Sequence, residues 1–224
     1  METRNRTSAW VMLAAGVAGL IASFILTTDK FKILKDAGYT PSCNINATLN
    51  CKSVMLSDQA EVFGFPNSII GIGAFSMMLV ISVLLFFGVG LPKLFLQLAT
   101  TGTVLAVIFC HWLAYQTTFE IGALCPYCMV AWVATLLVLS VLLRELIDIK
   151  EKATEDEDSK FAIATIKKWM VPFHVVWSAL LVGAAFLGET VTATDLIGAA
   201  CILLGSALVL GLLPLRRDAK SIAS

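Results

Sequence analysis

Long stretches without a charged residue constrain this chain more than any other feature. Six segments carry no Asp, Glu, Lys or Arg, and they span residues 7–28, 62–92, 94–119, 121–143, 169–188 and 196–215. Each is long enough for the roughly 20 apolar residues that a helix needs to cross a bilayer. Backbone polar groups in lipid must be paired within the protein, which favours helices over open strands. The sequence therefore predicts an all-α membrane protein with six spans.

Composition agrees with this prediction. Of the 224 residues, 58% are hydrophobic and 14% are charged, and the mean hydropathy is +0.86. Soluble domains are about 25% charged. The formal net charge is zero, and without a long basic run the chain gives no sign of nucleic-acid binding.

The distribution of Lys and Arg predicts the orientation of the spans. With the N-terminus inside, twelve of the sixteen basic residues fall on cytoplasmic segments, so both termini are expected in the cytoplasm of a multi-pass cell-membrane protein. The first segment has no small-residue cleavage site and is interpreted as a retained helix. The remaining four basic residues lie in the first outer loop and are interpreted as a solvated face: Lys30, Lys32, Lys35 and Lys52.

Four of the six cysteines collect on the outer face in this topology. Cys43 and Cys51 lie in the loop between the first two spans, and Cys125-Pro-Tyr-Cys128 opens the fourth span. Extracytoplasmic compartments permit disulfides. Cys125 is expected at a helix N-cap with Pro126 in the first helical position, where the helix dipole stabilises a thiolate. Two thiol pairs in one compartment suit thiol–disulfide exchange.

Other interpretations of the cysteines stay open. A Cys₄ zinc site is possible in principle, although structural zinc sites use short spacings in both ligand pairs. A scaffold held by structural disulfides is a second alternative. Cys110 and Cys201 fall inside apolar segments and are interpreted as small buried side chains. His111 lies in mid-segment, where an ionisable group is either functional or a hydrogen-bonded structural histidine.

Several motifs together resemble one known family. Cys51-Lys-Ser-Val54 follows the first loop cysteine, Phe63-Gly-Phe-Pro-Asn-Ser-Ile-Ile-Gly71 opens the second span, and Cys125-Pro-Tyr-Cys128 opens the fourth. Their order resembles the vitamin K epoxide reductase family, including its bacterial members that make disulfides, over residues 8–147. The resemblance implies a four-helix transmembrane bundle around a quinone, which would be menaquinone or ubiquinone. A C-terminal transmembrane hairpin would complete the six spans.

The resemblance also implies a role for individual residues. Cys43 would meet an external thiol partner, and Cys51 would pass electrons to Cys125. Cys128 would lie beside the quinone ring, and Asn67 would hydrogen-bond a quinone oxygen. Ser53 is expected to cap or activate Cys51. Animal members have a tyrosine donor four residues after the last active cysteine, and Trp132 stands there instead, with an indole N–H that can donate but not accept.

These implications define the expected organisation of the chain. Residues 1–147 would form the catalytic bundle with an outer cysteine loop at 29–65, residues 148–168 a charged cytoplasmic linker, and residues 169–224 two further helices and a tail. Many bacterial members carry a fused thioredoxin-like domain that this sequence does not show, so the expected partner is a separate DsbA-like protein.

The expected function is quinone-dependent disulfide formation in exported proteins. One alternative is vitamin K epoxide or quinone reduction in a secretory organelle, where the Asn46-Ala-Thr48 glycosylation sequon would matter. The other is a non-enzymatic scaffold or metal-binding membrane protein.

Overall fold

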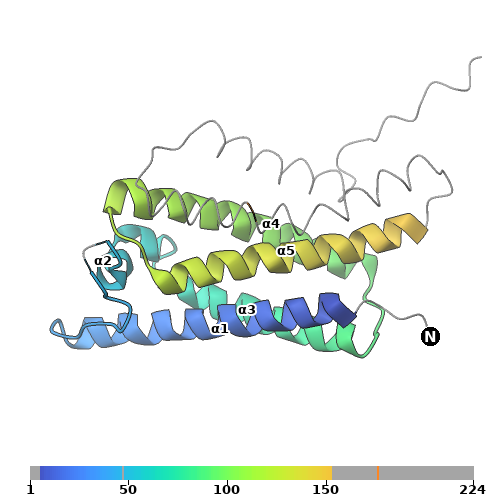
Figure 1. The fold of residues 1–224 in the computed structure, drawn as a ribbon, viewed down its shortest axis with the longest axis horizontal. Coiled ribbons are helices and arrows are strands. Elements are labelled where there is room, and N and C mark those ends of the chain that lie inside the picture. Colours follow the sequence, from blue (N-terminus) through green and yellow to red (C-terminus); the bar gives the residue numbers. More distant parts are fainter. Residues whose placement is uncertain (1–5, 47, 153–175, 177–224) are drawn as a thin grey trace, which may run out of the picture.

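Four long helices dominate the computed structural model, which describes residues 6–46, 48–152 and 176. They run antiparallel along one axis (Figure 1) and comprise α1 (Arg6–Lys35), α3 (Asn67–Phe86), α4 (Lys93–Tyr115) and α5 (Pro126–Lys152). Two short helices, α2 (Cys51–Met55) and η1 (Asp58–Glu61), lie between α1 and α3. A π-helical segment, η2 (Gln116–Ile121), continues α4.

All four long helices are long and apolar enough to cross a membrane. Large apolar side chains also face outward, and Val80, Leu94 and Leu105 are each more than 60% exposed. Such surfaces are costly in water and favourable in lipid. Of the last two predicted spans the structure describes only residue 176, so the C-terminal hairpin and Cys201 lie outside the described residues.

Proline and glycine set the helix boundaries. Pro66 and Pro92 directly precede α3 and α4, and Pro126 is the first residue of α5, where its missing N–H has no helical partner to lose. Helix α3 ends at a left-handed Gly88, with φ of 71°, and the Val89 N–H donates to the Leu84 carbonyl at 2.9 Å. Gly122 closes η2 in the same conformation, with φ of 67°, which L side chains rarely adopt.

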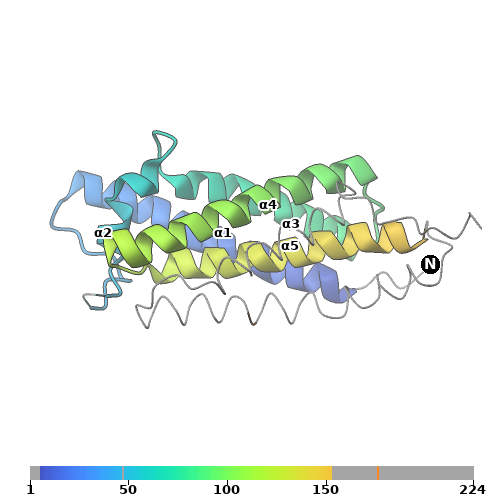
Figure 2. The ribbon, with the colours of Figure 1, turned by 90° about the horizontal axis from the view of Figure 1, so that it is seen from above.

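The helices pack in the spatial order α3, α1, α5, α4. Helix α1 packs along both α3 and α5, and α4 packs along α5, whereas α3 and α4 pack little against each other. Figure 2 shows the same bundle turned by 90°. The main core holds buried side chains mostly from α1, α3 and α5, such as Met12, Phe75 and Leu142, together with Leu96 from α4. The bundle is therefore closed on three sides and loosely closed between α3 and α4.

Two helices are longer than the charge pattern indicates. Helix α1 continues to Lys35, so the segment at 29–35, expected as the start of the outer loop, is helical. Helix α5 continues to Lys152, five residues into the expected linker at 148–168. Charged residues end an apolar stretch, but they do not end a helix when they find partners or reach water.

The contact between α1 and α3 depends on glycine, which yields a prediction. A Cβ atom at Gly19 would overlap the ring of Phe75, whereas a Cβ atom at Gly73, on α3, would meet nothing within 4 Å. Gly19→Ala is expected to lower the free energy of unfolding by about 1–3 kcal/mol through overpacking. Gly73→Ala should leave it unchanged or raise it slightly, since alanine favours helices. Thermal unfolding of the purified protein in detergent measures both, and equal effects would contradict the close approach.

Candidate functional site

The two loop cysteines form a disulfide at the end of the bundle that carries α2. Cys43 and Cys51 are bonded, with Cα atoms 5.8 Å apart, and both are buried, at 4% and 0% exposure. Cys51 is the first residue of α2. The helix is capped by Asn50, whose Oδ1 accepts the Ser53 N–H at 3.1 Å. Asparagine is one of the residue types favoured at a helix N-cap.

A short parallel β-bridge joins this loop to the segment before α5. Leu49 pairs with Leu124, the Leu124 N–H donates to the Thr48 carbonyl at 2.7 Å, and the Asn50 N–H donates to the Leu124 carbonyl at 3.0 Å. The chain then runs from Leu124 directly into Cys125 and from Asn50 directly into Cys51. Both cysteines are fully buried in one cluster. The bridge therefore brings together two cysteines that are 74 residues apart in the sequence.

The second cysteine pair lies at the start of α5, as the sequence predicts. Cys125 precedes Pro126, the first helical residue, and its Sγ accepts the Cys128 N–H at 3.3 Å. Cys125 and Cys128 are free thiols, the first buried and the second partly exposed. A backbone N–H that points at Sγ of Cys125 stabilises negative charge on that atom, together with the helix dipole.

Cys128 lines a large cavity inside the bundle. The cavity has a volume of about 540 Å³ and is lined by side chains from α1, α3, α4 and α5 as well as from the loop. Trp132, one turn after Cys128 on α5, lines the same cavity and is 7% exposed. Most of the wall is apolar. A cavity of this size and character suits a small apolar ligand, for which pockets of roughly 300–1,000 Å³ are usual.

Asn67 supplies a polar group to this cavity. It begins α3, and its Nδ2 donates to the Gln59 carbonyl at 2.7 Å. Its Oδ1 is buried and has no hydrogen-bond partner within the described residues. A buried oxygen without a partner is costly, and an amide can both donate and accept. A ligand with a carbonyl or hydroxyl oxygen would satisfy the second N–H or the orphaned oxygen of Asn67.

Lys30 lines the cavity, and its contacts correct one expectation. Its side chain is only 6% exposed, and its Nζ lies 2.8 Å from Oε1 of Glu61, whose side chain is 40% exposed. The same Nζ donates to the Met55 carbonyl at 2.6 Å. Because Met55 ends α2 and Glu61 ends η1, Lys30 holds both short helices to α1. The interpretation of Lys30 as part of a solvated face is therefore wrong.

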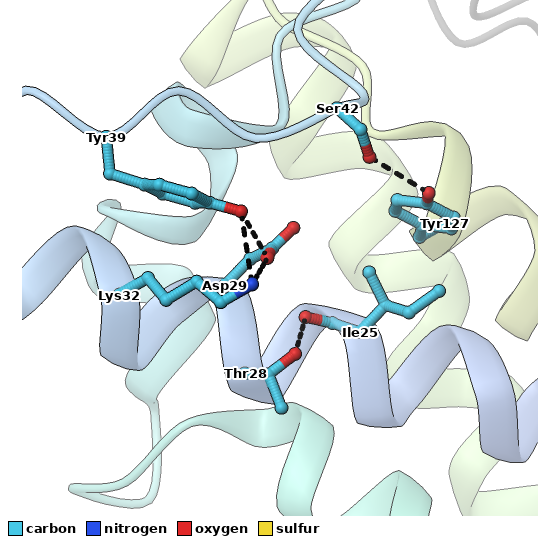
Figure 3. Close-up of polar contacts among 7 residues, drawn as sticks. All are labelled: Ile25, Thr28, Asp29, Lys32, Tyr39, Ser42 and Tyr127. Carbon is cyan, nitrogen blue, oxygen red and sulfur yellow. Dashed lines mark hydrogen bonds and ion pairs between the residues drawn. The ribbon is translucent and has the colours of Figure 1, made fainter.

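Further polar contacts anchor the loop that contains Cys43. The Lys52 Nζ donates to the carbonyls of Ala37 and Tyr39, at 2.6 and 3.0 Å. Figure 3 shows the Tyr39 hydroxyl, which donates to Oδ1 of the buried Asp29 at 2.8 Å. Lys52 is thus also a structural residue.

A separate contact joins the Cys43 segment to α5. The hydroxyls of Ser42 and Tyr127 lie 3.2 Å apart, as Figure 3 shows. Ser42 precedes Cys43, and Tyr127 is the residue between Pro126 and Cys128 in the second cysteine motif. This hydrogen bond therefore connects the two cysteine pairs through their neighbours.

The remaining residues from the sequence divide between the cavity and other places. Cys110 lines the cavity, which the interpretation as a simple buried side chain does not anticipate. The His111 ring pairs through Nδ1 with the Val107 carbonyl at 2.7 Å and does not line the large cavity. Ser53 is exposed and away from the cavity, and the capping expected of Ser53 is done by Asn50.

Sequence reasoning missed Lys30, Asn50, Gln59 and Tyr127. The Asx residue directly before Cys51 was a signal for Asn50. For the other three the signal is absent, because their roles depend on contacts between distant segments.

The arrangement is suited to passing electrons between sulfur atoms. The buried Cys43–Cys51 disulfide shares a cluster with a buried thiol, Cys125, whose own partner, Cys128, lines an apolar cavity. Thiol–disulfide exchange requires an attacking thiolate close to a disulfide sulfur. A Cys₄ zinc site is not formed by these four residues, because two of the sulfurs are bonded to each other.

Comparison with known proteins agrees with the motifs. No curated protein matches the chain. The family model described as "Vitamin K epoxide reductase family" matches residues 10–143, a range that contains both cysteine pairs, Asn67 and Trp132. This match covers more than half of the sequence, and it supports an oxidoreductase. The chain is a member of the vitamin K epoxide reductase family.

Proposed function

We propose that this protein is a quinone-dependent thiol oxidoreductase that makes disulfides for exported proteins. The observation that carries the proposal is the position of Cys128, which is hydrogen-bonded to Sγ of Cys125 through its N–H and lines the 540 Å³ cavity. Electrons would enter at Cys43 and Cys51 and leave at Cys128. The cysteines would face the extracytoplasmic side, and both termini the cytoplasm.

The relay can be written as balanced exchanges. A thiolate of a separate DsbA-like protein with a thioredoxin fold attacks Sγ of Cys43, and Cys51 leaves as a thiolate. The second thiol of the partner then releases Cys43, and the partner is oxidised. Cys51 next attacks Sγ of Cys125 in a Cys125–Cys128 disulfide, and Cys128 leaves. Cys43 attacks Cys51, restores the Cys43–Cys51 disulfide and releases Cys125. Each step forms one S–S bond and breaks one.

The dithiol of Cys125 and Cys128 then loses two electrons and two protons. The acceptor of both electrons and both protons would be a quinone held in the cavity, either menaquinone or ubiquinone. Asn67 would donate its second Nδ2 N–H to a quinone oxygen, and its unpartnered Oδ1 would accept from a hydroxyl of the reduced quinone. Trp132 would stand at the opposite side with an indole N–H that can donate. The largely apolar wall would exclude water from the thiolate.

Loss of Cys128 tests the class of reaction. Cys128→Ala is expected to abolish quinone reduction by the purified protein with a reduced dithiol donor, because the Cys125–Cys128 disulfide that quinone would regenerate can then no longer form. Cys110→Ala is the matched control, since Cys110 lines the same cavity but has no place in the relay, and it should keep turnover. The measurement is quinone absorbance over time. Equal turnover of Cys128→Ala and wild type would exclude the relay, and reduction of an epoxide alone would favour the alternative activity.

Asn67 can be tested against a neighbour. Asn67→Ala is expected to raise the KM for quinone about three- to tenfold, the value of one lost hydrogen bond. Gln59→Ala is the control, because it keeps the backbone carbonyl that Asn67 contacts and removes only the side-chain bond to Gln116. Steady-state kinetics at varied quinone concentration gives both values. A KM that rises equally in the two variants would mean that Asn67 acts on the loop alone.

The proximity of Cys51 and Cys125 can be tested by oxidation. The double variant Cys43→Ser/Cys128→Ser keeps Cys51 and Cys125, which the β-bridge holds together. We expect an intramolecular disulfide between them after mild oxidation, detected by peptide mapping under non-reducing conditions. The variant Cys43→Ser/Cys125→Ser keeps Cys51 and Cys128 and should form far less. If the second disulfide forms as readily as the first, the exchange order proposed here fails.

A further inference from the structure

Tyr127 joins the Cys125–Cys128 motif to the loop of the other cysteine pair through a side-chain hydrogen bond. Its hydroxyl lies 3.2 Å from that of Ser42, and its ring packs against the cluster that contains Cys43, Cys51 and Cys125. Tyr127 is half-buried and Ser42 is exposed. In Figure 3 the two hydroxyls face each other between the loop and the start of α5.

The loop on either side of Cys43 has other anchors. Residues 37 and 39 are held by Lys52, and Asn44 accepts the Lys52 N–H at 3.0 Å through Oδ1. Between them, residues 40–43 are held by the disulfide itself, by the buried side chain of Pro41, by the Asn44 N–H that donates to the Pro41 carbonyl at 3.1 Å, and by the hydrogen bond of Ser42. That hydrogen bond joins this segment to the long helix α5 by a side-chain polar contact.

The disulfide anchor is lost during the relay. When Cys51 is bonded to Cys125, Cys43 is a free thiolate and must attack Sγ of Cys51. At that moment the Cys43–Cys51 bond no longer fixes the segment. The Ser42–Tyr127 contact does not involve a sulfur atom, and Tyr127 follows Cys125 by two residues on the first turn of α5. The contact can therefore persist through the exchange and keep Cys43 near its target.

We infer that Tyr127 is a positioning residue, which holds the Cys43 segment through Ser42 so that Cys43 resolves the Cys51–Cys125 mixed disulfide. The inference rests on the proposed relay. In this step the Cys43–Cys51 bond forms, the Cys51–Cys125 bond breaks, and Cys125 leaves as a thiolate that accepts the Cys128 N–H. No electrons are gained or lost overall. A single neutral hydrogen bond shifts the ratio of held to released segment about fivefold. The Cys43 segment is therefore held near its target but can still move.

The test is a single-turnover experiment on the full chain. Protein with both disulfides formed by diamide receives one equivalent of dithiothreitol, and samples are quenched with acid and N-ethylmaleimide at intervals. Non-reducing peptide mapping then gives the amount of Cys51–Cys125 mixed disulfide. Tyr127→Phe is expected to slow its decay about fivefold relative to wild type. Tyr115→Phe, at the outer end of α4 with its ring on Phe119, should decay at the wild-type rate.

Further variants separate positioning from a general loss of structure. Ser42→Ala changes an exposed loop side chain and should slow the decay of the mixed disulfide by the same roughly fivefold factor. Ser42→Thr keeps the hydroxyl and should decay at the wild-type rate. The double variant Ser42→Ala/Tyr127→Phe should decay at the rate of each single variant, because both changes remove the same contact. Reduction of quinone by pre-reduced Cys125 and Cys128 should stay unchanged in all of them. Wild-type decay in Tyr127→Phe, or multiplied effects in the double variant, would overturn the inference.

The mapping experiment contains no quinone. If the wild-type protein reduces no quinone, that result contradicts the proposed function, while the decay of the mixed disulfide can still be interpreted.

Discussion

The parallel pairing of Leu49 with Leu124 is the interaction on which the rest of the site depends. Its two backbone hydrogen bonds join the cysteine loop to the start of α5. Leu124 stands directly before Cys125, and Leu49 directly before Asn50, the cap of the helix that begins at Cys51. Side chains alone would not hold Cys51 beside Cys125 with the same accuracy, since loops are the most mobile part of a helical bundle. Backbone pairing leaves the sulfur atoms free to exchange partners while the chain stays in register. The chemistry can therefore change at the sulfurs without a change in the fold around them.

The bundle is asymmetric, and the asymmetry creates the cavity. Helix α1 packs closely on α3 and α5, helped by glycine opposite Phe75. Helices α3 and α4 pack little on each other, and the space between the four helices remains open over about 540 Å³. Its polar groups gather at the end nearest the cysteines, where Asn67 begins α3 and Cys128 lies on the first turn of α5. An apolar ligand with one polar end fits such a space, since the wall offers little else for a polar group to bind.

Charge placement shows how far sequence reasoning reaches and where it stops. Gaps between charges located four helices correctly, since a charge in lipid is costly wherever it stands. The same reasoning ended the first helix too early, because it took Asp29 as the end of the span and Lys30 as part of a solvated face. Asp29 accepts from Tyr39, and Lys30 pairs with Glu61, so both are buried at the end of a continuing helix. The cap that was expected from Ser53 is provided by Asn50, three residues earlier in the chain. Capping depends on local backbone geometry that the motif does not specify.

The sequence by itself determined the membrane class, the four described helices, the family, and the placement of Cys125 before a proline-initiated helix. These features depend on local composition, on proline and on spacing, which act over one or two turns of chain. The resemblance already implied that Cys51 exchanges with Cys125, and only the tertiary structure supplied the bridge that brings them together. Only the tertiary structure decided that Lys30 lines the cavity and that Tyr127 contacts the loop of Cys43. Each of these contacts joins segments 25 to 85 residues apart. Packing selects such pairs among many that the sequence alone leaves equally possible, because the free energy of each contact depends on all the others that form with it.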